Sequence, residues 1–438
     1  MIRFGFGVVA SSLHPHEAVE RIVAPVASRL AELGGERVAD PTAYPDVPYL
    51  LVVATGGTEA AALDVLRRRA AAVPWEPVVL VAHPWHNSLP ASLETLARVS
   101  AEGGRGRIVQ VGDELGGVTA SDASTGERQP DPLETLLVDL AAMHRLRRAR
   151  LGLVGAPSEW LVASVPDAAA VRRRWGIELV EVDIADTIAG QRRADPVATR
   201  AVAVKFSRRR PGSDHAAASE PATVAGGEPA APAGETVAAA ALHPALVATI
   251  ERARVDAVTV RCFDFLGELT TSGCVALAEL NDTGVVAGCE GDVAGAVAMM
   301  LARELLGQAS WIANPAVASA ERGRLLLAHC TVAPSLVEEL ELHTHFESGL
   351  GIGLRGRFAL GPVTLLRLGG PDLGEHWFAD AQIVDTGGSA DLCRTQVTLQ
   401  LAPDRVAELL ERPLGNHLVL VHGHHRDRLE RWWRLAHE

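Results

Sequence analysis

A repeated alternation of short apolar runs with helix-spaced segments is the feature of this sequence that most constrains its fold. Residues 2–10 form an apolar run, and residues 17–33 then carry apolar side chains at helical spacing until Gly34 and Gly35 end the helix. The same order recurs downstream, with strands at 49–54 and 77–82 and helices at 59–72 and 90–102. Strands that alternate with helices at this pace form a parallel sheet covered by helices. The sequence therefore predicts a Rossmann-like, doubly wound α/β domain over residues 1–147.

The amino-acid pattern changes twice in the rest of the chain. A second α/β unit begins with apolar strands at 151–154 and 178–184. Residues 208–244 are dominated by Ala, Gly, Pro, Ser and Glu, a composition that predicts a mobile insertion. After about residue 325, short alternating runs separated by Gly and Pro indicate an antiparallel, barrel-like sheet. The predicted fold class is therefore α/β, with two Rossmann-like domains at 1–147 and 148–324 and a β-rich C-terminal domain at 325–438.

Charge and cysteine usage exclude several classes of protein. The 41 basic and 54 acidic residues give a net charge of −13, which disfavours binding to nucleic acids or anionic membranes. No apolar run reaches the roughly 18–20 residues that a membrane span needs, and the N-terminus reads as a strand rather than a signal peptide. The five cysteines form no CxxC pair, which disfavours a disulfide framework or a zinc ribbon. We expect a soluble, cytoplasmic protein.

Acidic residues and histidines that could bind a metal concentrate in the second half of the chain. They are Glu290 and Asp292 in one glycine-flanked turn, His329, the group His343, His345 and Glu347, and His417. Oxygen and imidazole ligands of this kind suit Mn²⁺, Mg²⁺, Fe²⁺ or Co²⁺. Glu290 is the most informative, because it follows an apolar strand and precedes a helix, where open α/β sheets bind ligands. Capping of that helix is the alternative role for Glu290 and Asp292.

Short stretches spread over nearly the whole chain resemble the L-fucose isomerase and L-arabinose isomerase superfamily, and more closely its shorter, fucose-isomerase-like members. These stretches are Thr55-Gly56-Gly57-Thr58-Glu59, Asn87-Ser88-Leu89-Pro90-Ala91-Ser92-Leu93-Glu94, Pro157-Ser158-Glu159-Trp160-Leu161, Leu280-Asn281-Asp282, Cys289-Glu290-Gly291-Asp292, Ala328-His329-Cys330-Thr331, Thr344-His345-Phe346-Glu347-Ser348-Gly349, Cys393-Arg394-Thr395-Gln396 and Gly415-Asn416-His417. The resemblance implies two Rossmann-like domains followed by a β-rich domain. It also implies a Mn²⁺-dependent aldose–ketose isomerase that acts on an open-chain sugar through a cis-enediol(ate).

The resemblance also assigns metal ligands. Glu290 matches the superfamily's acidic ligand and acid/base position, and His417 matches its C-terminal histidine ligand. The second carboxylate ligand falls near Asn314 or, by the arabinose-isomerase pattern, near His329, and this chain has no Asp or Glu at either position. We therefore expect a metal bound by Glu290, His417 and Asn314 or His329, with Glu290 and Asp292 as the catalytic carboxylates.

Substrate contacts are expected from two parts of the chain. On a strand, His343, His345 and Glu347 would share one face, and would either line the site together or lie together on a solvated face. The resembling motif centres on His345, which favours His345 as the contact. Members of the superfamily form oligomers in which the first domain of one subunit covers its neighbour's active site. By that analogy, His86, Asn87 and Ser88 contact a sugar bound to another chain of a homo-oligomer, although a polar loop that caps the following helix is the alternative.

Three functions remain in contention at this stage. The leading hypothesis is a metal-dependent sugar isomerase of carbohydrate metabolism that acts on a fucose-like, arabinose-like or modified sugar. The missing carboxylate favours an alternative, a sugar-binding or regulatory paralogue without turnover. A third hypothesis is a metal enzyme on the same scaffold that acts on a sulfo- or deoxy-sugar, which an arginine pocket for an anionic substituent would favour.

Overall fold

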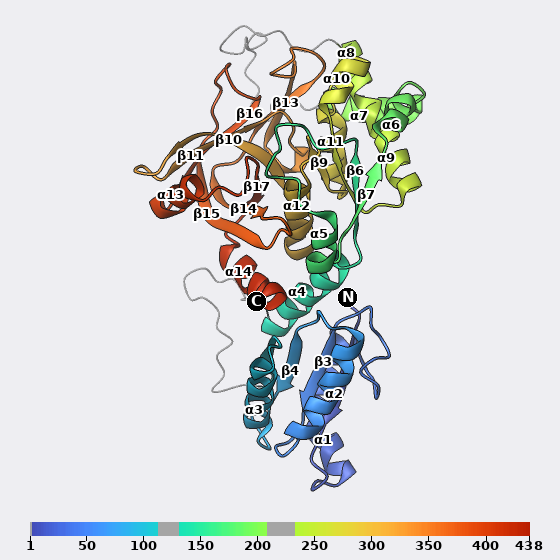
Figure 1. Cartoon of the computed structure of the whole chain (residues 1–438), viewed down its shortest axis with the longest axis vertical. Coiled ribbons are helices and arrows are strands. Elements are labelled where there is room, and N and C mark those ends of the chain that lie inside the picture. Colours follow the sequence, from blue (N-terminus) through green and yellow to red (C-terminus); the bar gives the residue numbers. More distant parts are fainter. Residues whose placement is uncertain (1, 113–130, 208–232) are drawn as a thin grey trace, which may run out of the picture. The chain divides into compact units, whose positions relative to one another are not determined.

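The computed structural model describes residues 2–112, 131–207 and 233–438. The chain divides into two compact units, which are coloured along the sequence in Figure 1. Unit 1 comprises Met1–Arg145 together with Glu430–Glu438, and unit 2 comprises Leu146–Leu429. The predicted fold class is confirmed, because parallel sheets flanked by helices are followed by a closed antiparallel barrel.

Unit 1 is built on a five-stranded parallel sheet with strand order β2-β1-β3-β4-β5. Its strands are β1 (Phe4–Val9), β2 (Gly35–Arg37), β3 (Tyr49–Val53), β4 (Val78–Ala82) and β5 (Gly106–Gln110). Its helices are α1 (His16–Glu32), α2 (Glu59–Ala72), α3 (Ser88–Ala101) and α4 (Pro132–Leu146), and it takes in the end of α14 (Arg426–His437). Every residue of β3 is buried, which explains why that strand reads as a continuous apolar run.

The first part of unit 2 is a four-stranded parallel sheet with strand order β7-β6-β8-β9. Its strands are β6 (Arg150–Val154), β7 (Glu178–Val182), β8 (Ala257–Val260) and β9 (Ala287–Cys289). The accompanying helices are α5 (Ala168–Trp175), α6 (Ile184–Gln191), α7 (Pro196–Ser207), α8 (Ala233–Ala240), α9 (Leu242–Ala253), α10 (Phe263–Leu269), α11 (Cys274–Thr283) and α12 (Val293–Leu306). Because parallel strands share one carboxyl edge, the loops after β6, β8 and β9 meet there.

A closed antiparallel barrel with strand order β10-β11-β16-β15-β14-β17 completes unit 2. Its strands are β10 (Trp311–Ser319), β11 (Arg324–His329), β14 (Gly361–Gly369), β15 (Glu375–Asp385), β16 (Thr395–Leu401) and β17 (Leu418–His422). The hairpin β12 (Glu339–His343) and β13 (Gly353–Arg357), the 3₁₀ turn η1 (Pro334–Leu336) and helix α13 (Pro403–Glu411) lie between these strands in the sequence. The barrel begins with β10, ahead of residue 325, because β10 pairs with both β11 and β17.

The predicted insertion at 208–244 is wrong in its last part. Residues 208–232 lie outside the described residues, but the stretch after them forms α8 and the start of α9. Ala239, Ala240 and Leu242 have no exposed surface, so the helices bury small apolar side chains against the rest of unit 2. The difference arises because an alanine-rich composition fits a mobile segment, whereas alanine is also the best helix former.

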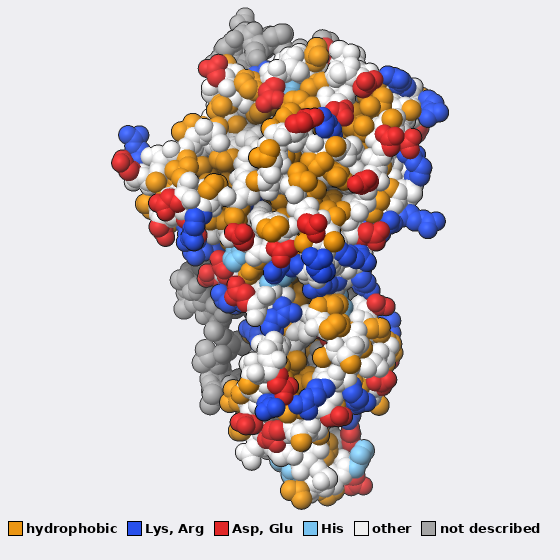
Figure 2. Space-filling view, in the orientation of Figure 1, with side chains coloured by type: hydrophobic (Ala, Val, Ile, Leu, Met, Phe, Trp, Pro, Cys, Tyr) orange, Lys and Arg blue, Asp and Glu red, His pale blue; other side chains and the backbone are white. Residues whose placement is uncertain are grey.

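On the face of unit 2 drawn in Figure 2, acidic and basic side chains are interspersed. Within the same described residues, no helix is both long enough and apolar enough to cross a membrane.

Candidate metal centre and active site

Glu290 occupies a strained turn at the carboxyl end of β9. Its φ is 63° and that of Gly291 is 72°, so two consecutive residues are left-handed. A residue other than glycine pays about 1–2 kcal/mol for this conformation, and such strain is concentrated at functional sites. The turn is held by hydrogen bonds from Ser158 N to Glu290 O (2.9 Å) and from Gly291 N to Val260 O (3.0 Å). A Cβ on Gly291 would lie 2.7 Å from Pro157 Cα, so the approach of the loop after β6 requires glycine here.

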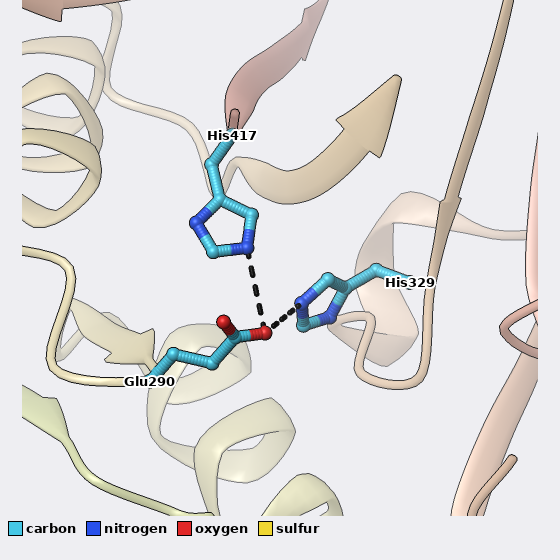
Figure 3. Close-up of side chains that lie close together, drawn as sticks. All are labelled: Glu290, His329 and His417. Carbon is cyan, nitrogen blue, oxygen red and sulfur yellow. Dashed lines mark ion pairs between the residues drawn. The ribbon is translucent and has the colours of Figure 1, made fainter. Parts of the chain in front are cut away.

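Three side chains from separate parts of unit 2 converge at this turn, as Figure 3 shows. Glu290 follows β9, His329 ends β11, and His417 immediately precedes β17. Glu290 Oε1 lies 3.6 Å from His329 Nε2 and 3.5 Å from His417 Nε2. All three residues are buried, and their potential ligand atoms lie within 4.8 Å of one another. We call Glu290, His329 and His417 the triad.

The triad has the character of a metal site rather than of a closed ion-pair network. The distances from Glu290 to both histidines are longer than a hydrogen bond. Among the described residues, His417 Nε2 and His329 Nδ1 are buried and have no hydrogen-bond partner. A buried polar atom without a partner costs about 1–3 kcal/mol, which a bound cation would offset at His417 Nε2, the one of these two nitrogens that faces Glu290. Two imidazoles and one carboxylate are a common donor set for divalent transition metals.

A second carboxylate lies behind His417 and sets its orientation. Asp292 Oδ2 accepts hydrogen bonds from His417 Nδ1 (2.8 Å) and Arg367 Nη1 (3.2 Å), while its Oδ1 accepts from Gly295 N (2.7 Å). Arg367 is fully buried and also donates to Ser164 Oγ at 2.6 Å. Because a carboxylate only accepts, Nδ1 of His417 carries the proton of that hydrogen bond and Nε2 faces Glu290. Asp292 itself has no exposed surface.

The pKa values of the triad follow from burial and mutual contact. Burial alone would raise the pKa of Glu290, but the contacts with His329 and His417 outweigh it and hold that pKa well below its usual range. Burial lowers the pKa of His329, with Glu290 opposing the effect only in part. Burial opposes charge on His417 too, yet Asp292 and then Glu290 raise its pKa to about 9. A cation that binds at Nε2 would therefore displace a proton from His417.

An aromatic row borders the triad. Trp160, from the loop after β6, donates a hydrogen bond from Nε1 to Glu290 Oε2 at 2.6 Å. Its ring meets that of Phe263 edge to face at 5.1 Å, and Phe263 meets His345 in the same way at 5.6 Å. Trp160 lies in one of the stretches that carry the resemblance, but the sequence alone predicts no role for it. The usable signal was its position just after β6, because the carboxyl edge of a parallel sheet brings β6 and β9 loops together.

His345 and Glu347 interact electrostatically with Glu290 of the triad, whereas His343 contacts Glu341. The expectation that the three share a strand face is wrong, because β12 ends at His343, whose Nε2 lies 3.1 Å from Glu341 Oε2. Burial lowers the pKa of His345 to about 4, so its imidazole is neutral at pH 7. Glu347 is exposed, and partial desolvation together with the charge of Glu290 raises its pKa.

Asn314 lies in β10, and its amide is engaged outside the triad. Its Oδ1 accepts a hydrogen bond from Asn416 Nδ2 at 3.0 Å. The described carboxylates, histidines and cysteines that group into a potential metal site are Glu290, His329 and His417. Of the two positions predicted for the missing carboxylate ligand, His329 lies in this group, and a metal contact by the Asn314 amide stays a prediction.

The remaining predicted substrate contacts belong to unit 1. His86 and Asn87 are exposed and left-handed, with φ of 53° and 56°. Ser88 has no exposed surface, and its hydroxyl donates to Val53 O and accepts from His83 N, so it anchors the loop after β4. His86 and Asn87 are thus the two residues of this group with side chains open to a partner. Contact with a neighbouring subunit's substrate stays a prediction.

The chain is similar to sulfoquinovose isomerases over part of its length. It is 27% identical over 181 residues to the enzyme of Alkalicoccus urumqiensis and 26% identical over 191 residues to those of Priestia aryabhattai and Priestia megaterium. Each match covers 40% of this chain and 41% of the relative, so it spans about two fifths of either protein. No family model matches the chain.

Proposed function

We propose that this protein is a metal-dependent aldose–ketose isomerase, with a sulfonated sugar as the first substrate to test. The observation that carries the proposal is the buried triad, in which His417 Nε2 faces a carboxylate held in a strained turn and has no hydrogen-bond partner. The partial similarity to sulfoquinovose isomerases supports the same reaction class.

Glu290, His329 and His417 would hold the metal, for which Mn²⁺ is the predicted ion. When bound there, a divalent cation would act as a Lewis acid toward sugar oxygens and acidify the neighbouring C–H. His329 is neutral where the superfamily pattern has a carboxylate, so the protein cancels less of the cation's charge. A less neutralised cation is a stronger Lewis acid, which suits turnover despite the missing carboxylate.

Aldose–ketose isomerisation moves a proton between C1 and C2, and the protein must supply the group that carries it. A carboxylate whose pKa is far below neutral, such as Glu290, is a good ligand but a weak base. Glu347 has a raised pKa, is exposed, and feels the charge of Glu290, which makes it the better proton carrier. We assign Asp292 to orienting His417 in place of the acid/base role predicted from the sequence, because its side chain is sealed from any substrate.

The activity is tested by exchange of the C2 proton in D₂O with added Mn²⁺, followed by NMR over a panel that includes L-fucose, L-arabinose and sulfoquinovose. We expect exchange with at least one sugar, abolished by Glu290→Gln and strongly reduced by Glu347→Gln. Saturable sugar binding without exchange for any sugar would contradict isomerase activity and favour the sugar-binding paralogue, for which the lack of an acid at Asn314 and His329 is the supporting observation.

A further inference from the structure

We propose that Trp160 is a substrate-positioning residue of this site, which orients Glu290 with its indole N–H and presents its open ring face to the C–H face of the sugar. This inference rests on the proposed isomerase function.

The first support is that the two carboxylate oxygens of Glu290 have different partners. Oε1 faces His329 and His417 at 3.6 and 3.5 Å, while Oε2 accepts the indole N–H of Trp160 at 2.6 Å. The indole nitrogen donates only, so this bond fixes the rotation of the carboxylate about its last torsion. Without it, Oε2 could turn toward the histidines, and the donor set offered to a cation would change.

The second support is that the fold holds Trp160 in place from both sides. Ser158 donates its backbone N–H to Glu290 O at 2.9 Å, and Leu161, which is buried, donates its own to Ser158 O at 3.0 Å. Farther along the loop, Ser164 Oγ accepts from the buried Arg367 at 2.6 Å. The loop that carries the indole is therefore tied to the same turn and the same arginine that organise the triad.

The third support is that Trp160 is open to solvent despite this anchoring. It is 52% exposed, although its indole nitrogen bonds Glu290, a residue that is 7% exposed. Its edge-to-face contact with Phe263 leads on to His345, so the indole is both the member of this aromatic row that bonds Glu290 and its most exposed member. A large, rigid ring at the rim of a polar site is suited to bind the apolar C–H surface of a sugar while polar groups bind its hydroxyls.

Two substitutions separate the two roles. Trp160→Phe keeps an aromatic face but removes the N–H donor, and Trp160→Leu removes both. Val162→Ala is the matched control, since Val162 lies on the same loop and is 88% exposed. The measurements are the Mn²⁺ dissociation constant of the metal-free protein, kcat and KM for the sugar found active, and the change of intrinsic fluorescence on sugar binding.

We expect Trp160→Phe to weaken Mn²⁺ binding or lower kcat by about 10-fold or more, as loss of an outer-shell partner does, with KM changed little. Trp160→Leu should in addition raise KM by roughly 3–10-fold, the scale of one aromatic contact. The wild-type fluorescence response to the sugar should shrink in both Trp160 variants and persist in Val162→Ala.

Wild-type activity with both Trp160 variants matching Val162→Ala would overturn this inference and leave the proposed function intact. A wild-type protein that neither binds Mn²⁺ nor exchanges the C2 proton would overturn both. If Trp160→Leu fails to fold, Trp160→Phe with unchanged Mn²⁺ affinity, kcat and fluorescence response still contradicts the inference.

Discussion

Each unit contains a buried glutamate beside histidine, and the two clusters are built differently. In unit 1, Glu76 Oε1 lies 2.6 Å from His144 Nε2, and Arg69 donates to both carboxylate oxygens at 2.6 and 2.9 Å. The three side chains are 5% exposed or less. In unit 2, Glu290 stands 3.5 and 3.6 Å from its two histidines. We call the unit 1 cluster closed, because both oxygens of Glu76 are hydrogen bonded within it. We call the triad open, because Glu290 is beyond hydrogen-bond distance of both histidines.

The two clusters differ in which carboxylate their buried arginine bonds. Arg69 brings a fork of donors directly to Glu76, whereas the buried Arg367 of unit 2 bonds Asp292 and so supports His417 from behind. A buried Glu–His pair therefore does not by itself indicate a metal site. The indication comes from nitrogen atoms that face the carboxylate without a partner, as His417 Nε2 does.

The largest expected effect is on turnover when the open cluster is altered. Glu290→Gln should lower kcat by about 10³-fold or more, because Lewis-acid stabilisation of several kcal/mol is lost with the metal. The variant should lose less unfolding free energy than Glu76→Gln, the matched substitution in the closed cluster. Steady-state kinetics and urea denaturation of both variants test this pair, and near-normal kcat in Glu290→Gln would refute the role of the triad.

A substitution in the closed cluster should lower the free energy of unfolding and leave turnover unchanged. Arg69→Met leaves Glu76 buried without its charge partner, so the unfolding free energy should fall by about 3–5 kcal/mol. Mn²⁺ affinity and the KM for sugar should stay as in the wild type while the protein is folded. Denaturation followed by circular dichroism measures the loss, and a change below about 1 kcal/mol would mean that the cluster is not a structural anchor.

A smaller effect is expected from the carboxylate behind His417. Asp292→Asn keeps a hydrogen-bond acceptor for Nδ1 but removes the charge, and such outer-shell changes typically weaken metal affinity by about 10–100-fold. Asp282→Asn is the control, because Asp282 is a carboxylate of the same unit that bonds Lys205 at 2.9 Å. Equal Mn²⁺ dissociation constants for the two variants would show that Asp292 does not position His417.

The smallest effect concerns a second closed cluster, in unit 2, where Lys205 bonds Glu279 and Asp282 at 2.5 and 2.9 Å. Burial alone would raise the pKa of Asp282, but Lys205 and the hydrogen bonds from Ser335 together outweigh it, and the pKa lies below its ordinary value of 3.8. The stabilisation is therefore fully present above pH 3.8 and is lost as the pH falls through the lowered pKa.

Lys205→Met should accordingly reduce the unfolding free energy by about 1 kcal/mol at pH 7. The difference from the wild type should narrow in acid, below the ordinary pKa of Asp282. A difference that stays constant from pH 7 into acid would contradict the assigned ion pair, and thermal unfolding across that range measures it.

Hydrophobic periodicity was enough to predict the fold class and the place of Glu290. The runs at 2–10, 49–54 and 77–82 became β1, β3 and β4, because strands buried on both faces carry few polar residues. Helices α8 and α9 were missed in part, since alanine-rich sequence fits both a helix and a mobile segment.

His329 and His417 were among several candidate ligands in the sequence, and only the resemblance singled them out as partners of Glu290. Whether His329 or Asn314 joins it depends on how the turn after β9 and the barrel strands β10, β11 and β17 come together, and that pairing is long-range. Trp160 and Arg367 were missed as site residues for the same reason. Trp160 is 130 residues away in sequence from Glu290, which it contacts. Arg367 is 75 residues away from its partner Asp292.

Titration of the metal-free protein with Mn²⁺, followed by electron paramagnetic resonance of the free ion, tests the central claim most directly. The account predicts one Mn²⁺ bound per chain in the wild type and in Glu76→Gln, with binding lost in Glu290→Gln. No bound Mn²⁺ in the wild type, or equal binding in Glu290→Gln, would contradict it.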